Sequence, residues 1–345
     1  MRHLSLLLFG LVISISACKK TTLSAIADNF VVRRNGADLP VRVYGNGSSK
    51  QFILLLHGGP GGNGLEYRQG KYAEILESKY AIAYLDQRGQ GMAQGHYQEE
   101  DLSLASLAAD VHAVARTLKE KYGNEISLYL FGHSWGGTLG TNVMLNPDYA
   151  QMYEAWIEAD GAHDWPLNDK GAIELFKTVG QSQIDNNNDV DFWTEVVNEV
   201  SSMDTNNLSN ENTYFLNSKG FEAEQYLLNI DTLAQGTESF YGSSLYGKNA
   251  LTNWWSGTAT NGKITEYNNL ATLNYTPQLN QISTPTLFLW GKYDFVVPPI
   301  VGTTGYENIG STLKRFVLFE KSGHSPMNNQ PEEFAQAIID FIEDL

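Results

Sequence analysis

The sequence predicts an α/β fold built on a mostly parallel central sheet, with a helical segment inserted late in the chain. Short, continuously apolar runs recur along the chain and alternate with segments of helical spacing. This is the pattern of strands that are buried on both faces of a parallel sheet. The alternation stops where Asn, Gly, Ser and Thr become frequent, which indicates an insertion. The predicted parallel strands are 52–56, 81–85, 128–131, 155–159, 286–290 and 316–319.

Two β-rich runs, residues 30–34 and 39–44, come before this pattern. Residues 35–36, Asn-Gly, separate them and are a strong hairpin signal. Apolar residues at helical spacing over residues 104–118 predict a helix between two of the strands, and residues 331–345 predict the closing helix. The chain therefore opens with a hairpin and ends with a helix.

The insertion divides the predicted core into two stretches of sequence. We expect residues 29–160 and 282–345 to form the α/β core, and residues 161–281 to form a helical cap over the ends of the strands. The alternative is a separate domain, but strands of one sheet bracket the insertion, so it would still have to lie against them. No internal repeat is present.

The composition is that of a folded, acidic protein. The 345 residues are 42% hydrophobic and 12% aromatic, and they carry a formal net charge of −16 at pH 7. This apolar fraction can bury a full-sized core. The acidic excess repels phosphate backbones, so we expect no nucleic acid partner. No pattern in the chain predicts an oligomeric state.

The N-terminus has the pattern of an export signal. Its apolar run, residues 4–15, follows a basic start and is too short to span a bilayer, for which about 20 residues are needed. Residues 15–18, Ile-Ser-Ala-Cys, resemble a bacterial lipobox, and Cys18 is the only cysteine in the chain. We expect residues 1–17 to be a signal peptide, Cys18 to carry the only membrane anchor, and residues 18–28 to be a tether in the periplasm or cell envelope. A plain secretory signal is the alternative.

One motif points to a nucleophile. Residues 132–136 read Gly-His-Ser-Trp-Gly, so Ser134 occupies the centre of G-x-S-x-G between a predicted strand and a helical segment. Such a strand-to-helix turn strains the serine backbone and exposes the hydroxyl at the carboxyl edge of the sheet. The alternative is a structural turn, which the flanking strand and helix disfavour.

A serine hydroxyl needs a base to accept its proton and a carboxylate to orient that base. Asp294 and His324 each follow a C-terminal strand, and the order Ser, Asp, His along the chain is that of α/β-hydrolases. We expect His324 to act as general base and then general acid, and Asp294 to hold its tautomer. Asp160 competes for the acid role because it directly follows the strand 155–159.

The loop after the first parallel strand supplies candidates for an oxyanion hole. Residues 57–62 read His-Gly-Gly-Pro-Gly-Gly, so the backbone N–H of Gly59 is the expected donor beside that of Trp135. The same loop satisfies G-x-G-x-x-G, and Asp86 ends the next strand where a ribose-binding acid would lie. This alternative is weak, because Pro60 removes a donor from the supposed phosphate loop and the other catalytic candidates stay unexplained.

No pattern predicts a metal or a cofactor. The sequence has no H-E-x-x-H motif, and its single cysteine is assigned to the anchor. A serine triad needs neither.

Taken together, these motifs resemble the prolyl aminopeptidase (proline iminopeptidase) branch of the α/β-hydrolases. The matching stretches are residues 57–61, 86–91, 132–137, 291–294 and 323–326. The resemblance implies an α/β-hydrolase fold with a helical cap, a tetrahedral intermediate at Ser134, and release of an N-terminal residue, often proline, from a small peptide. Residues 86–89, within one of these stretches, would support the structure, and we expect them to form a loop with a buried ion pair.

The cap departs from the pattern of that family. There, carboxylates of the cap hold the free amine of the substrate, and one Glu follows a Trp-containing motif; here Ser256 follows Trp254-Trp255. Glu222, Glu224 or Glu195 are candidates to replace that Glu. Trp254 and Trp255 are candidates to line an apolar pocket, or they pack within the cap.

Three hypotheses about function remain open on the sequence. The first is a serine peptidase of the prolyl aminopeptidase type. The second is a carboxylesterase or related acyl hydrolase on small esters or amides, which the missing cap Glu favours. The third is a non-catalytic binding lipoprotein, against which an intact set of Ser134, Asp294 and His324 argues.

Overall fold

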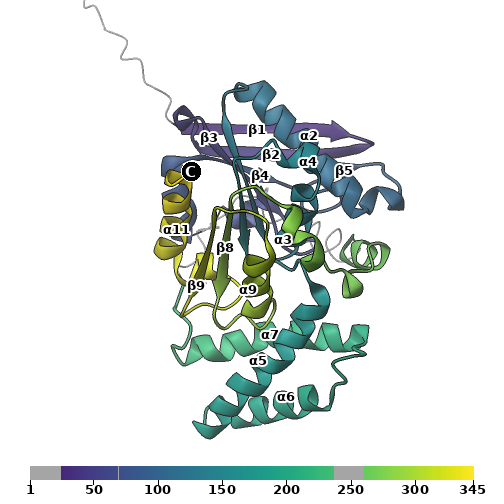
Figure 1. The fold of residues 1–345 in the computed structure, drawn as a ribbon, viewed down its shortest axis with the longest axis vertical. Coiled ribbons are helices and arrows are strands. Elements are labelled where there is room, and N and C mark those ends of the chain that lie inside the picture. Colours follow the sequence, from purple (N-terminus) through teal and green to yellow (C-terminus); the bar gives the residue numbers. More distant parts are fainter. Residues whose placement is uncertain (1–24, 69, 237–259) are drawn as a thin grey trace, which may run out of the picture.

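A computed structural model describes residues 25–68, 70–236 and 260–345 of the chain (Figure 1). Its centre is a nine-stranded sheet in the order β1-β2-β4-β3-β6-β7-β8-β9, with the short β5 paired to β2. From β4 to β9 all neighbours are parallel, whereas β1, β2 and β5 join in antiparallel fashion. The strands are β1 Ala25–Arg34, β2 Ala37–Asn46, β3 Gln51–Leu56, β4 Ala81–Leu85, β5 Gln94–Gly95, β6 Ser127–His133, β7 Ala155–Ala159, β8 Thr286–Gly291 and β9 Lys314–Phe319.

The opening hairpin is longer than the sequence predicts. Asn35 and Gly36 form its turn with φ values of 42° and 74°, as the Asn-Gly signal indicates. Strand β1 already begins at Ala25, which pairs with Asn46. Residues 25–28, expected to belong to the tether, are therefore part of the sheet. Alternating exposure along β1 explains the difference, because an edge strand of this kind has no continuous apolar run.

Helices cover both faces of the sheet. The strands present alternate residues to two apolar clusters: Phe52, Leu54 and Leu56 join the cluster that α2, α3 and α9 complete, whereas Ile53 and Leu55 join that of α1 and α11. The helices are α1 Gly70–Lys79, α2 Leu104–Tyr122, α3 Trp135–Met144, α4 Pro147–Ala150, α5 Trp165–Asp185, α6 Val190–Ser202, α7 Asn210–Asn229, α9 Pro299–Asn308, α10 Pro326–Asn329 and α11 Pro331–Glu343.

Helices α5, α6 and α7 lie together at one end of the molecule, beyond the ends of β8 and β9 (Figure 1). They follow β7 in the chain, have their own apolar cluster, and contact the core through Phe295. Residues 260–267 are also helical. The expected signal peptide 1–17, Cys18, Trp254 and Trp255 lie outside the described residues. Within the described ranges, no helix is long and apolar enough to cross a membrane.

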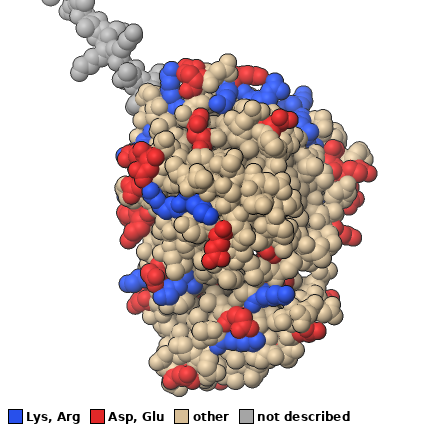
Figure 2. Space-filling view, viewed as in Figure 1, with Lys and Arg blue, Asp and Glu red and all other residues tan. Residues whose placement is uncertain are grey.

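Acidic and basic side chains are interspersed over the face seen in Figure 2. Several form exposed ion pairs, such as Lys79 with Glu343 at 2.9 Å. Pairs of this kind contribute little to stability in water. The apolar clusters on the two sides of the sheet therefore hold the fold together and fix the loops at the carboxyl ends of its strands.

Candidate active site

The turn at Ser134 has the backbone strain that the G-x-S-x-G pattern predicts. Strand β6 ends at His133, helix α3 begins at Trp135, and Ser134 between them has φ 56° and ψ −122°. A positive φ is uncommon for a residue with a side chain. A Cβ atom on Gly132 or Gly136 would lie 2.3 Å or 2.2 Å from a backbone oxygen, so both glycines let strand and helix pack closely. This is the geometry of a nucleophile elbow.

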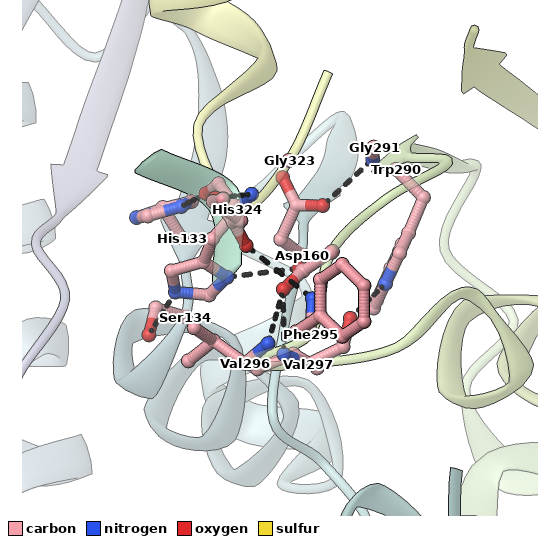
Figure 3. Close-up of polar contacts among 12 residues, drawn as sticks. His133, Ser134, Asp160, Trp290, Gly291, Phe295, Val296, Val297, Gly323 and His324 are labelled. Atoms are coloured by element: carbon pink, nitrogen blue, oxygen red, sulfur yellow. Dashed lines mark hydrogen bonds and ion pairs between the residues drawn. The ribbon is translucent and has the colours of Figure 1, made fainter. Parts of the chain in front are cut away.

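The hydroxyl of Ser134 lies beside an imidazole from the far end of the chain (Figure 3). Its Oγ is 3.0 Å from Nε2 of His324, and Nδ1 of His324 is 2.8 Å from Oδ2 of Asp294. The other oxygen of Asp294 accepts hydrogen bonds from the backbone N–H groups of Val296 and Val297, at 2.8 and 2.7 Å. A continuous hydrogen-bonded chain thus runs from the hydroxyl to a fully buried carboxylate.

The two acids and the imidazole lie on the loops that follow three neighbouring strands. Asp160 follows β7, Asp294 follows β8 and His324 follows β9, so all three lie at the same edge of the sheet. The carboxylate that contacts the imidazole is that of Asp294. Asp160, the competing acid, accepts a hydrogen bond from the N–H of Gly291 at 2.9 Å instead (Figure 3).

Burial governs the protonation of the imidazoles at the site. His324 is only 4% exposed, and burial lowers its pKa to about 3. Burial, with a smaller contribution from His324, also lowers the pKa of His133 to about 3. Both rings are therefore neutral at neutral pH. A neutral His324 can accept a proton from the neighbouring hydroxyl.

Sequence reasoning missed a second hydrogen-bonded chain, in which His133 holds the backbone of His324. The N–H of Gly58 donates to the Tyr67 hydroxyl at 2.8 Å, that hydroxyl contacts Nδ1 of His133, and Nε2 of His133 lies 2.7 Å from the carbonyl oxygen of His324. A carbonyl only accepts, so Nε2 donates and Nδ1 accepts from the hydroxyl. The histidine inside G-H-S-W-G was the only sequence signal for this contact.

The Gly-rich loop after β3 lies against the nucleophile. A Cβ atom on Gly58 would lie 3.1 Å from Cβ of Ser134. Trp135 is the first residue of helix α3, so its N–H has no acceptor within the helix. Among the described residues, none accepts a hydrogen bond from the N–H of Gly59. Both predicted oxyanion donors are therefore available to a ligand at this edge of the sheet.

The turn after β4 supports that loop through two glutamines. Gln90 accepts a hydrogen bond from the N–H of Gly61 at 2.6 Å. Gln87 donates to the carbonyl of His57 and accepts from the indole N–H of Trp135, each at 2.9 Å. The turn therefore links the Gly-rich loop to the residue after the nucleophile.

The charged residues of the same turn are structural. Arg88 makes a two-pronged contact with Asp110, both distances being 2.7 Å, and so forms a buried ion pair of the kind expected for this loop. Asp86 accepts from the N–H of Gly64 at 2.8 Å and from Arg42 at 2.9 Å. Since both oxygens of Asp86 are engaged, it offers no free carboxylate to a ribose, and the dinucleotide alternative loses its acid.

Helix α7 of the cap lies directly over the loops of Asp294 and His324. The carboxylate of Glu224 accepts hydrogen bonds from the N–H groups of His324 at 2.9 Å and Phe295 at 3.3 Å. The ring of Phe221 meets that of His324 edge to face, with 5.8 Å between centroids. Glu224, one of the residues predicted to bind substrate, therefore lies beside the triad but is occupied by main-chain donors.

The other two cap glutamates lie on the surface of the cap. Glu222 is exposed and pairs with Lys219 at 2.9 Å, and Glu195 lies 3.6 Å from the same ammonium group. Neither presents a free carboxylate next to the triad.

A cavity of about 1000 Å³ lies between the Gly-rich loop and the cap. Gly59 and Val296 line it on the core side, and Asp169, Thr213 and Glu266 line it on the other. Among its described lining residues there are two carboxylates and no Lys or Arg. Asp169 is 5% exposed, and burial raises its pKa. The cavity therefore favours neutral or cationic ligands over anionic ones.

Comparisons with known proteins agree with this geometry. Residues 51–329 match the family model described as alpha/beta hydrolase fold. The chain is 25% identical, over 83% of its length and 87% of the relative, to the probable aminopeptidase YbaC of Bacillus subtilis (strain 168). It is 23% identical, over 89% of its length and 90% of the relative, to a proline iminopeptidase of Saccharolobus solfataricus.

A solved structure shares the same architecture. The esterase EaEST from Exiguobacterium antarcticum superposes with a TM-score of 0.57 at 18% identity, over 92% of this chain and all of that one. At this identity the likeness concerns the fold. With the family match over most of the chain, it establishes that this protein belongs to the α/β-hydrolase fold family, with relatives among the proline iminopeptidases.

Proposed function

We propose that the protein is a serine hydrolase that works through an acyl-enzyme, with Ser134 as nucleophile, His324 as base and Asp294 as the acid that orients it. The observation that carries the proposal is the unbroken contact from Oγ of Ser134 to Nε2 of His324 at 3.0 Å, and from Nδ1 to Asp294 at 2.8 Å. Hydrogen-bonded Ser-His-Asp triads of this geometry activate a serine hydroxyl on several unrelated folds.

The geometry supports a two-step reaction. Neutral His324 takes the hydroxyl proton as Oγ of Ser134 attacks the carbonyl carbon of the substrate, and the N–H groups of Gly59 and Trp135 stabilise the negative oxygen of the tetrahedral intermediate. The imidazolium then protonates the leaving group. Water hydrolyses the acyl-enzyme by the same proton transfers in reverse order.

As substrate class we propose peptides with a free N-terminal residue, proline among them. Two observations support this. The relatives named as aminopeptidase and proline iminopeptidase align over most of the chain. The cavity next to Gly59 is lined by Glu266 and Asp169 and by no basic side chain among its described residues, so no charge of that lining repels a substrate ammonium group.

An esterase or related acyl hydrolase is the second candidate, because a specific observation favours it. Glu224 uses both carboxylate oxygens on main-chain N–H groups, and Glu222 pairs with Lys219. A cap without a free glutamate beside the triad holds an ammonium group less firmly. Small neutral esters would then be the better substrates.

A substrate panel tests both candidates with the full-length protein. We expect arylamides of proline and of other amino acids to be cleaved faster than their N-acetylated forms, because blocking the amine removes its charge. Ser134→Ala should lower kcat by about 10³-fold or more with nearly unchanged stability. Cleavage of acyl esters alone would reject the peptidase in favour of the esterase, and activity that survives Ser134→Ala would reject both.

A further inference from the structure

Asp160 is a buried acid directly behind the triad. It follows β7, is 0% exposed, and has a φ of 43°, which is uncommon for a residue with a side chain. Its Oδ1 accepts one hydrogen bond, from the N–H of Gly291 (Figure 3). Its Oδ2 is buried, and no N–H or hydroxyl group of the described residues donates to it. An ionised carboxylate with half of its acceptor capacity unused would be costly in this position.

The neighbouring group is another carboxyl. The side chains of Asp160 and Asp294 interact electrostatically, and both residues contact Gly291, Asp160 through the N–H of that glycine and Asp294 through its carbonyl oxygen. Two carboxyl groups can share a hydrogen bond only when one of them carries a proton. Asp294 is the better anion, because Val296 N–H, Val297 N–H and Nδ1 of His324 surround it at 2.7–2.8 Å. Asp160 has a single N–H donor, so the proton belongs on Asp160.

The charges around Asp160 favour the same assignment. Burial raises the pKa of both carboxyl groups well above the usual value, but the interaction with Asp294 raises the pKa of Asp160 further, whereas the interaction with Asp160 lowers that of Asp294. The other titratable groups that face this position are Glu224 from α7, Tyr67 from the loop before α1, and His324 beyond Asp294. None of these brings a fixed positive charge to the Asp160 side chain.

We propose that Asp160 is a positioning residue, held as a neutral acid, that donates a hydrogen bond to Asp294 and keeps that carboxylate ionised and aimed at His324. The proposal rests on the proposed function of the triad. On this account, the two candidates for the acid of the triad have different roles. Asp294 contacts the imidazole as the anion, and Asp160 acts through Asp294 as a donor.

Infrared spectroscopy tests the location of the proton without using activity. The difference spectrum between wild type and Asp160→Asn at neutral pH should contain the carbonyl stretch of a protonated carboxyl group, lost in the variant. If the difference contains only carboxylate bands, Asp160 is ionised and the proposal is overturned. This result stands whether or not the protein is a hydrolase, so it separates failure of the inference from failure of the proposed function.

Kinetics test the route through Asp294. An asparagine can accept from Gly291 and donate to Asp294, so Asp160→Asn should retain most of kcat/KM, with its acidic pH limb unmoved. Asp160→Ala should lower kcat by about 10-fold or more, which corresponds to about 1.4 kcal/mol. In an Asp294→Ala background the same alanine substitution should cause little further loss.

Two outcomes of these kinetics would contradict the proposal. An acidic limb that moves to lower pH in Asp160→Asn would mean that the substitution removed a negative charge. Additive losses in the double variant would mean that Asp160 acts independently of Asp294. If the wild type showed no more turnover than Ser134→Ala, that result would instead contradict the proposed function.

Discussion

At the scale of single residues, the main feature is an imidazole that is shielded from water. The ring of His324 lies 4.8 Å from that of His133 and 5.8 Å from that of Phe221, measured between centroids. Only 4% of His324 is exposed. The imidazolium form loses hydration in such a place, which is why burial lowers the pKa to about 3. The base is therefore neutral at pH values where an ordinary histidine is protonated.

This predicts activity in mildly acidic solution. A base must be neutral to accept the serine proton, and a lowered pKa keeps it neutral as the pH falls. The acidic limb of kcat/KM should therefore lie below about 6.5, the usual pKa of histidine. Steady-state rates over the pH range give the limb, and circular dichroism at each pH controls for unfolding. A limb at or above the usual histidine value would contradict this account of the site.

Most residues of the site could be predicted from the sequence, because the G-x-S-x-G turn and the order of the motifs are local signals. The choice between Asp160 and Asp294 could not be settled in that way, since each follows a strand of the same sheet edge. The contact of His133 with the carbonyl oxygen of His324 joins residues 191 positions apart. No local pattern encodes such a contact.

At the scale of elements, helix α7 is fastened to two loops of the core at once. Glu224 accepts N–H donors from the loop after β8 and from the loop after β9. A Cβ atom on Gly323 would lie 2.1 Å from a carboxylate oxygen of Glu224. The absence of a side chain at Gly323 therefore allows Glu224 to approach this loop closely. The position of the cap and the position of His324 are therefore linked.

We expect Glu224→Ala to lower both stability and kcat. The substitution leaves the N–H groups of His324 and Phe295 without their acceptor, and an unsatisfied buried donor costs about 1–3 kcal/mol. The matched control on the same helix is Glu222→Ala, whose carboxylate is exposed. Thermal unfolding and turnover of the two variants are compared; equal behaviour would mean that Glu224 does not hold the loops.

The strands of the parallel part were predicted close to their observed bounds, because buried strands are continuous apolar runs. The predicted start of β1 was wrong, since the sequence of an edge strand with alternating exposure resembles that of a polar linker. For the cap, the sequence predicts helical structure but not the bounds of α5, α6 and α7. Their apolar cluster forms by packing among α5, α6 and α7, and spacing within one segment does not define it.

At the scale of the whole molecule, a buried ion pair joins parts that are distant in sequence. Arg88, with a fully buried side chain, binds Asp110 of α2 and donates to the carbonyl oxygens of Arg34 and Asn35 in the hairpin turn. The turn that carries Arg88 also holds the loop of Gly59 and Gly61 through Gln90. The same network of hydrogen bonds and ion pairs therefore contributes to the stability of the fold and to the shape of the site.

Removing one partner of this pair should destabilise the whole fold. We expect Asp110→Ala to lower the free energy of unfolding by about 3–5 kcal/mol, because it leaves the guanidinium buried without its counter-charge. The control is Glu125→Ala, which removes an exposed partner of Lys50 and should leave the unfolding midpoint nearly unchanged. Denaturant unfolding measures both. A small effect of Asp110→Ala would show that Arg88 is solvated or paired elsewhere.

A fluorophosphonate probe tests most directly whether the bend at residue 134 presents an activated hydroxyl. Such probes phosphonylate a serine whose proton a neighbouring base removes. Peptide mapping of the labelled full-length protein should find the adduct on Ser134, with no labelling in Ser134→Ala and much slower labelling in His324→Ala. An unlabelled Ser134 in folded protein, or labelling at an unchanged rate without His324, would contradict the assignment of these side chains.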